Sequence, residues 1–171
     1  GFMSTPIIVM GAHGGIGECL TRILVAQDYN VCATAREKET LSPLSDELGI
    51  QSLSVDVLDT QSIENMIVAV DQGEGIQGLA FCIGSIDMKP LKASKDEDFV
   101  NSYELNVLGA VRALRAAEKS LKKAKGRVVL FSTIAVQQGF TNHSLISTAK
   151  GAIEGLTRAM AAEWAPNIRV N

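Results

Sequence analysis

The sequence predicts an α/β fold in which one parallel β-sheet is covered by helices on both faces. Short β-rich segments alternate with longer helical patterns along the whole chain, and 46% of the 171 residues are hydrophobic, enough to bury a core. A glycine-rich segment follows directly after the first β-rich segment. This alternation is typical of a doubly wound sheet, because parallel strands need a crossover connection that is usually a helix.

Six segments are predicted to be strands because they are short, apolar and β-rich. They are residues 6–10, 30–35, 51–55, 78–83, 127–131 and 168–170. Five longer segments with helical periodicity lie between them. They are residues 16–27, 41–48, 61–70, 96–121 and 147–164. Right-handed crossovers place the first strand near the centre of the sheet, with ligand binding expected outside the carboxyl ends of the strands.

The chain is expected to form one domain, because no linker, repeat or low-complexity tract interrupts this pattern. The domain, residues 1–171, is predicted to be a three-layer doubly wound parallel sheet, a Rossmann fold. It is expected to be incomplete at the C-terminal end, because Asn171 ends the chain while a strand is still forming. Residues 1–2 precede Met3 and are expected to be a cloning remnant.

Composition and charge argue against several partners. The formal net charge is −3, and no run of lysine or arginine offers a surface for nucleic acid. No apolar run approaches the roughly 18 residues of a membrane span, and the N-terminus lacks a signal-like pattern.

The three cysteines, Cys19, Cys32 and Cys82, lie far apart in apolar stretches. This spacing indicates buried thiols rather than disulfides or metal ligands, and a cytoplasmic location.

The segment from Gly11 to Gly17 is the clearest candidate for ligand binding. It reads GAHGGIG and lies between a strand and a helix, as a dinucleotide-binding turn requires. Gly11 permits the tight turn, Gly15 lets the backbone approach a pyrophosphate, and Gly17 allows close packing. The helix N-terminus attracts the anion, and His13 and Ile16 belong to the same predicted cofactor site. A glycine-rich turn without a ligand is the alternative.

The GxxxGxG spacing resembles the short-chain dehydrogenase/reductase family. The resemblance implies that Asp56, followed by apolar Val57, contacts an adenine; a turn or helix-start residue is the alternative for Asp56. Of the family's Asn-Asn-Ala-Gly sequence in the fourth strand, the chain keeps Gly84, which retains backbone proximity to the cofactor. Asn106 begins a match to the family's Asn-x-x-Gly. Asparagine is unfavourable inside a helix, which indicates a function, although a solvent-facing position is the alternative.

The end of the second predicted strand bears on the choice of dinucleotide. An acidic residue there favours NAD, because it bonds the ribose hydroxyls and repels a 2′-phosphate. This chain has neutral Ala35 followed by Arg36, which is suited to a phosphate, so NADP is expected and NAD is possible. His13 is a candidate to assist. The alternative is that Arg36 is a surface cation opposite Glu37 and Glu39.

Residues 126–133 and 145–157 resemble the family's fifth strand and following helix. The family uses a serine after the strand, and a tyrosine and a lysine four residues apart on the helix. The lysine lowers the pKa of the phenol, ordinarily about 10, and holds the ribose. Alignment on Lys150 puts Ile146 at the tyrosine position and Thr133 at the serine position. Neither of the chain's two tyrosines lies in this helix, so a small shift of alignment does not restore the group.

Three substitutes for the missing proton donor are considered. His143 lies one helical turn before the vacant position, and its imidazole has an ordinary pKa near 6.5. A loop or capping histidine is the alternative. In the second possibility, Thr133 holds a carbonyl while Lys150 delivers a proton through water, and Asn106 supports this relay. The alternative for Lys150 is an ordinary surface lysine. Ser147 lies about 100° around the helix from the vacancy and is expected to face elsewhere.

Two functions are consistent with these residues. The first is an oxidoreductase that transfers hydride between NADP(H) and a small carbonyl or alcohol substrate, with atypical proton delivery. The second is a catalytically silent NAD(P)-binding sensor or structural subunit, which Ile146 favours. Retention of Asn106, Thr133 and Lys150 together favours the enzyme.

The two longest predicted helices suggest self-association. Both are rich in small residues that allow close packing: Ala110, Ala113, Ala116, Ala117, Ala149, Ala152, Ala159 and Ala162. The family commonly pairs these helices between subunits, so a homodimer or homotetramer is expected, with packing against the sheet as the alternative. The family also continues past the segment matched by residues 168–171. An exposed sheet edge therefore favours a further segment or a partner, and a monomeric size for the full-length protein contradicts the assembly.

Overall fold

The structure is a computed structural model of the chain, and it describes residues 4–84, 88–131 and 143–171. In this part of the chain, six parallel strands form one sheet in the order β3-β2-β1-β4-β5-β6. The strands are β1 (Ile7–Met10), β2 (Val31–Ala35), β3 (Gln51–Ser54), β4 (Gly78–Phe81), β5 (Arg127–Leu130) and β6 (Arg169–Val170). This order confirms the predicted doubly wound sheet with the first strand near its centre.

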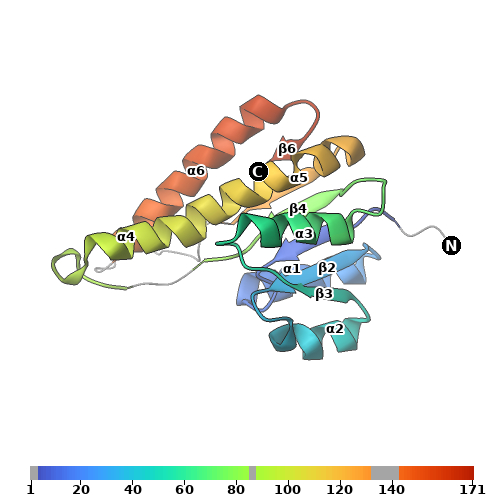
Figure 1. Ribbon diagram of the computed structural model, residues 1–171, viewed down its shortest axis with the longest axis horizontal. Helices are drawn as coiled ribbons and strands as arrows, with labels where there is room; N and C mark the ends of the chain where they lie inside the picture. The colour runs from blue at the N-terminus through green and yellow to red at the C-terminus, as the bar shows by residue number, and fades with distance from the viewer. Residues whose placement is uncertain (1–3, 85–87, 132–142) are drawn as a thin grey trace.

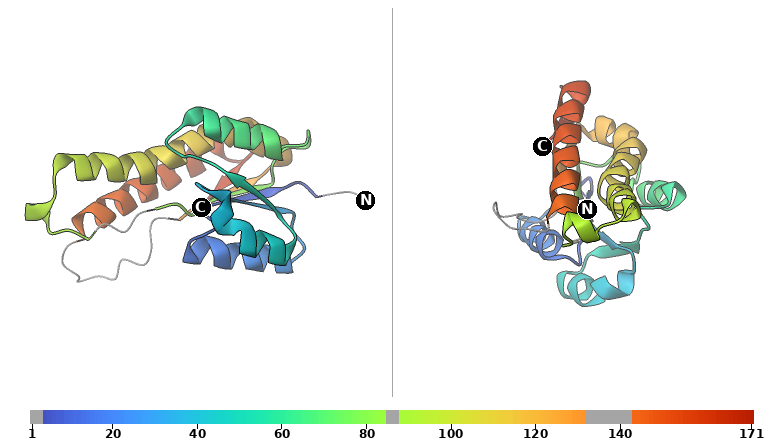
Figure 2. Two further views of the ribbon diagram at one scale, coloured as in Figure 1. Left: turned by 60° about the horizontal axis from the view of Figure 1, so that its bottom comes forward. Right: turned by 90° about the vertical axis from the view of Figure 1, so that its left-hand side faces the viewer.

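Helices cover both faces of the sheet (Figure 1). On one face lie α1 (Gly15–Ala26) and α2 (Ser42–Leu48), and on the other lie α3 (Thr60–Val70), α5 (Gly109–Ala124) and α6 (Ser144–Trp164). Helix α4 (Asp96–Tyr103) precedes α5, and 3-10 turns span Lys38–Leu41 and Leu91–Ala93. The views in Figure 2 show α3 beside α5, and these two helices pack against each other. The predicted three layers are confirmed.

The core lies on both faces of the central strand. Ile8, Val9 and Met10 of β1 are fully buried, with Ile8 and Met10 in the larger apolar cluster and Val9 in the smaller one. A strand that is buried on both faces needs an unbroken apolar run, which explains its sequence IIVM. Burying each such side chain stabilises the fold by roughly 1.5–3 kcal/mol. The core therefore holds rigid the strand whose end carries the glycine-rich segment.

The long helix predicted over residues 96–121 is interrupted. A π-helical segment, Glu104–Leu108, separates α4 from α5. Asn106 lies in this segment with only 4% of its surface exposed, and its Nδ2 donates to the Ser102 carbonyl at 2.9 Å and the Ser102 hydroxyl at 3.2 Å. The alternative of a solvent-facing asparagine is therefore wrong. A side-chain bond to a carbonyl four residues earlier competes with the regular helical bond, and π-helical turns are frequent at functional sites.

Burial bears on two further expectations and corrects the first of them. Cys19 is exposed, because it lies on the solvent face of α1, whereas Cys32 is buried and Cys82 is partly buried. Three of the small residues in α5, Ala110, Ala113 and Ala117, are buried in the core of the chain itself. These alanines therefore pack against the sheet, and the predicted homodimer or homotetramer stays a prediction without their support.

Asp71, at the C-terminal end of α3, ties the following turn to α5. Its Oδ1 accepts hydrogen bonds from the Gly73 and Gly75 amides at 2.8 and 3.0 Å, and its Oδ2 accepts one from the Ser120 hydroxyl at 2.6 Å. The Ser120 bond, supported by the two amides, lowers the pKa of Asp71 below its ordinary value. A folded-state pKa below the unfolded one contributes stability that is present above the unfolded pKa and lost as pH falls through the folded pKa.

We expect Asp71→Asn to lower the free energy of unfolding by about 1–3 kcal/mol at pH 7, because it weakens hydrogen bonds to a charged acceptor. Below about pH 4 the difference from the wild-type chain shrinks, because protonation removes the same charge from Asp71. Urea unfolding at several pH values measures this. Glu74→Gln, at an exposed position in the same turn, is the control, and equal stability of the two variants at pH 7 contradicts the proposed tie.

Candidate functional site

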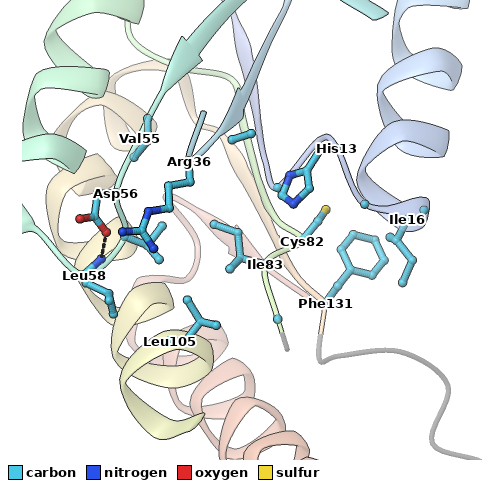
Figure 3. Close-up of a pocket in the computed structure, with 16 residues that line it drawn as sticks. His13, Ile16, Arg36, Val55, Asp56, Leu58, Cys82, Ile83, Leu105 and Phe131 are labelled. Carbon is cyan, nitrogen blue, oxygen red and sulfur yellow. Dashed lines mark hydrogen bonds between the residues drawn. The ribbon is translucent and has the colours of Figure 1, made fainter. Parts of the chain in front are cut away.

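A cavity of about 680 Å³ lies at the carboxyl ends of β1 to β5 (Figure 3). This volume is within the roughly 300–1,000 Å³ typical of small-molecule sites. Figure 3 shows Arg36 and Asp56 on one side of the cavity, with Ile16 and Phe131 on the opposite side. The cavity thus has a charged end and an apolar end, and it lies where the strand order reverses.

The turn between β1 and α1 requires glycine for reasons of space. Gly11 has a φ of +80°, and a Cβ there would lie 2.9 Å from the Cys82 carbonyl oxygen. A Cβ on Gly17 would lie 2.2 Å from the Gly11 carbonyl oxygen, so helix and strand approach too closely for any side chain. A Cβ on Gly15 would meet nothing within 4 Å. Gly15 borders the cavity, so its missing side chain leaves space for a ligand rather than for protein.

The N-terminus of α1 faces this space. Gly14 is the N-cap residue, and no side chain caps the helix. The first amides of a helix lack partners within it, and together with the helix dipole they attract an anion. The amides of Gly11 and Ala12, which precede the helix, both donate to the Thr34 carbonyl at 3.0 Å. These two bonds fix the turn against β2. The predicted pyrophosphate position therefore has the donors and the space that such a group needs.

The charged end of the cavity is built by the segments after β2 and β3. Arg36 is exposed, and none of the ion pairs within the described residues includes it, so the pairing with Glu37 or Glu39 is not observed. Asp56 borders the cavity and also accepts the Leu58 amide on Oδ1 at 3.0 Å. Asp56 therefore both lines the cavity and forms the alternative turn, and no hydrogen bond to its Oδ2 is observed from the described residues.

The apolar end includes residues that the sequence analysis did not select. Cys82, Ile83 and Phe131 line the cavity there, and two further apolar residues, Leu58 and Leu105, line it on the side of Asp56 and Arg36 (Figure 3). For Cys82, Ile83 and Phe131 the position at the end of a predicted strand is a sequence signal, whereas Leu58 and Leu105 had none. Burial raises the pKa of Cys82 to about 12, so this residue is a neutral thiol at physiological pH and adds to the apolar character of the wall.

The predicted cofactor residues come together at this cavity. Eight of them line it: Gly11, His13, Gly15, Ile16, Arg36, Asp56, Val57 and Gly84. Gly17 does not line it and serves the packing of the turn instead. Asn106 lies next to Leu105, which does line the cavity.

Neither Lys150 nor His143, the predicted catalytic residues at α6, is among the described residues that line the cavity. Lys150 has a side chain 41% exposed, with its Nζ 3.9 Å from Glu154 Oε1, which is a weak ion pair. His143 is the N-cap residue of α6, and its carbonyl accepts the Ser147 amide at 2.8 Å. Ile146 is 5% exposed whereas Ser147 is exposed, so Ser147 faces elsewhere as expected. Thr133 lies outside the described residues.

The described segments offer few other kinds of site. In residues 4–84, 88–131 and 143–171, no group of three His, Cys, Asp or Glu side chains is arranged to hold a metal ion. Among the same residues, none of the helices combines the length and the apolar character that a membrane span requires.

Comparison with known proteins identifies similar sequences and folds. A sequence model of a family described as Enoyl-(Acyl carrier protein) reductase matches residues 11–171. The L-xylulose reductase of Bos taurus is 30% identical over 171 residues, which cover 96% of this chain and 68% of that protein.

Solved structures share the fold closely. A short-chain dehydrogenase from Streptomyces avermitilis has a TM-score of 0.89 and 27% identity, over 99% of this chain and 64% of that one. An alcohol dehydrogenase from the archaeon Thermococcus sibiricus, complexed with 5-hydroxy-NADP, has a TM-score of 0.86 and 25% identity, over 96% of this chain and 73% of that one. The chain thus spans between 64% and 73% of the length of these relatives.

The glycine turn provides a test that needs no ligand. We expect Gly17→Ala to lower the free energy of unfolding by at least about 2 kcal/mol, because its Cβ overlaps the Gly11 carbonyl oxygen and forces the backbone apart. Gly15→Ala is the matched control, and we expect it to change stability by less than about 0.5 kcal/mol, because the added methyl group meets open space. Thermal unfolding measures both. Equal effects of the two substitutions contradict the packing described for the turn.

Proposed function

Since the chain belongs to the short-chain dehydrogenase/reductase family, we propose that it is an NADP-dependent oxidoreductase acting on a small molecule. The proposed reaction transfers hydride between NADP(H) and a carbonyl or alcohol carbon. The observation that carries this proposal is the cavity at the carboxyl ends of the strands, where a glycine turn and an uncapped helix meet a charged wall and an apolar wall. The dinucleotide supplies the hydride when it is bound.

The residues present fit a dinucleotide. The open space at Gly15 and the donors of α1 suit a pyrophosphate. Asp56 and Val57 suit an adenine, since the carboxylate has an oxygen available beside a buried apolar side chain. Ile16 and Phe131 suit a flat, weakly polar ring at the opposite end (Figure 3). His13 and Gly84 complete the proposed lining.

Preference for NADP over NAD rests on Arg36. The neighbouring Ala35 offers no carboxylate to repel a 2′-phosphate, and Arg36 borders the cavity with no ion pair inside the described part of the chain. A guanidinium donates forked, charge-assisted hydrogen bonds that match phosphate oxygens. The complex of the Thermococcus sibiricus enzyme with 5-hydroxy-NADP is consistent with this preference in a relative.

Proton delivery is the unusual part of the proposal. A carbonyl that accepts hydride needs a proton on its oxygen, and the aliphatic Ile146 can neither donate nor accept one. We assign that role to water held by Lys150 and Thr133, with Asn106 supporting the relay, or to His143. The Lys150 ammonium is free to exchange its long, exposed contact with Glu154 for another partner, because such pairs are worth little.

A silent dinucleotide-binding subunit is the second candidate. It is favoured by Ile146, which is buried and so has a packing role, and by the absence of Lys150 from the described residues that line the cavity. It requires the same cofactor site, so binding alone does not separate the two candidates. Measurement of catalytic turnover separates the two candidates.

For either candidate we propose a cytoplasmic location, which the three free thiols support.

The cofactor preference is tested at Arg36. We expect Arg36→Ala to raise the Kd for NADPH about ten- to a hundredfold, because charge-assisted hydrogen bonds to the 2′-phosphate are lost. The Kd for NADH should change little, since NADH lacks that phosphate. Fluorescence titration measures both constants, and Lys38→Ala, two residues further on, is the control for a general loss of positive charge. A parallel loss of NADPH affinity in both variants contradicts a specific role for Arg36.

The catalytic assignment is tested by turnover. We expect a panel of carbonyl and alcohol substrates to reveal oxidation of NADPH or reduction of NADP+, followed by cofactor absorbance. Lys150→Ala should lower the rate by on the order of 10²–10⁴ if Lys150 directs the proton. His143→Ala distinguishes the two donors, because only one of the two substitutions should abolish the pH dependence of the rate. NADPH binding with no turnover above these variants supports the silent subunit and overturns the enzyme.

A further inference from the structure

Arg112 on α5 joins two walls of the cavity that are far apart in the sequence. Its Nη1 donates to the Val57 carbonyl at 3.1 Å and to the Glu104 carbonyl at 3.5 Å. Its Nη2 donates to the Glu104 carboxylate at 2.7 Å. The Arg112 side chain is only 16% exposed. One guanidinium thus contacts the segment after β3 and the start of the π-helical segment at the same time.

Both contacted segments line the cavity. Val57 borders it together with Asp56 and Leu58. Glu104 is the first residue of the π-helical segment, which carries Leu105 into the lining (Figure 3) and also carries Asn106. The proposed adenine wall, formed by Asp56 and Val57, and the proposed relay residue, Asn106, are therefore held by a single side chain. This side chain, Arg112, is not among the residues that line the cavity.

The chemistry of the contacts favours a fixed geometry. A guanidinium presents its donors in a rigid planar fork, and a largely buried one is costly unless its donors are paired. The Glu104 carbonyl also accepts the Gly109 amide, the bond that closes the π-helical turn. Arg112 and Glu104 are eight residues apart, beyond the spacing of an ordinary pair on one helical face, so their contact is not a local helix-surface pair.

We propose that Arg112 is a positioning residue that sets the shape of the cofactor cavity. It locks the segment 56–58 to the π-helical segment, so that the proposed adenine wall and Asn106 take their positions together. The role in cofactor affinity rests on the proposed function, whereas the lock itself does not. Substitution of Arg112 should consequently loosen both segments in the free chain and weaken NADPH binding without changing the preference for a 2′-phosphate.

Hydrogen exchange of the free chain tests the lock directly. The Leu58 amide, which donates to Asp56, reports on the first segment, and the Gly109 amide, which donates to Glu104, reports on the second. In Arg112→Met, which keeps the apolar stem, both amides should exchange at least about threefold faster than in the wild-type chain. Arg115→Met is the matched control, because Arg115 is exposed on the same helix.

Cofactor titration of the same variants gives the second measurement. Arg112→Met should raise the Kd for NADPH and for NADH by a similar factor, about three- to tenfold, whereas loss of Arg36 affects NADPH alone. Titrations well below the unfolding temperature of each variant exclude a contribution from global unfolding. Glu104→Gln, which keeps the guanidinium and removes only its charged partner, should change both measurements in the same direction and decides the matter if Arg112→Met does not fold.

The proposal is overturned if Arg112→Met matches Arg115→Met in the exchange of both amides. It is also overturned if only one of the two amides responds, because the guanidinium then does not couple the segments. Failure of the wild-type chain to bind either dinucleotide contradicts the proposed function instead. The hydrogen-exchange comparison still decides the lock in that case, so the two failures are distinguishable.

Discussion

The contact between Gly17 and the Gly11 carbonyl is the constraint on which the rest of the site depends. It brings the first turn of α1 against the end of β1 with no room for a side chain on Gly17, and it directs the N-terminus of α1 into the cavity. The fully buried strand β1 supplies the rigid support, because its apolar side chains are packed on both faces. The anion-attracting end of α1 is therefore held by the hydrophobic core.

The second organising feature is the π-helical segment. It turns Asn106 into the protein rather than toward solvent and places Leu105 in the cavity wall. Helix α5 approaches the sheet closely at Gly109, where a Cβ would lie 3.2 Å from the ring of Phe81. Arg112, one turn further along, connects this segment to the segment after β3. The cavity is thus shaped as much by contacts behind its walls as by the residues that line it.

The doubly wound sheet with its first strand near the centre, and a ligand cavity at the carboxyl ends of the strands, could be predicted from sequence, because alternating patterns and the glycine turn depend on local chemistry. The interruption at Glu104–Leu108 could not, because a single π-helical turn of five residues is too short to change the apolar pattern of the helix around it. Arg112 had no signal either, because its partners, Val57 and Glu104, adjoin it only in the folded chain. The exposure of Cys19 depends on which face of α1 meets the core.

We infer that the cavity at the strand ends is a dinucleotide site organised by the glycine turn. Chemical-shift mapping of the isotope-labelled wild-type chain during titration with NADP+ tests it most directly. We expect saturable shifts that are largest for the amides of Gly15, Ile16 and Arg36, which line the cavity after β1 and β2. Saturable shifts confined to residues outside this cavity, or none at all, would contradict a dinucleotide site at the strand ends.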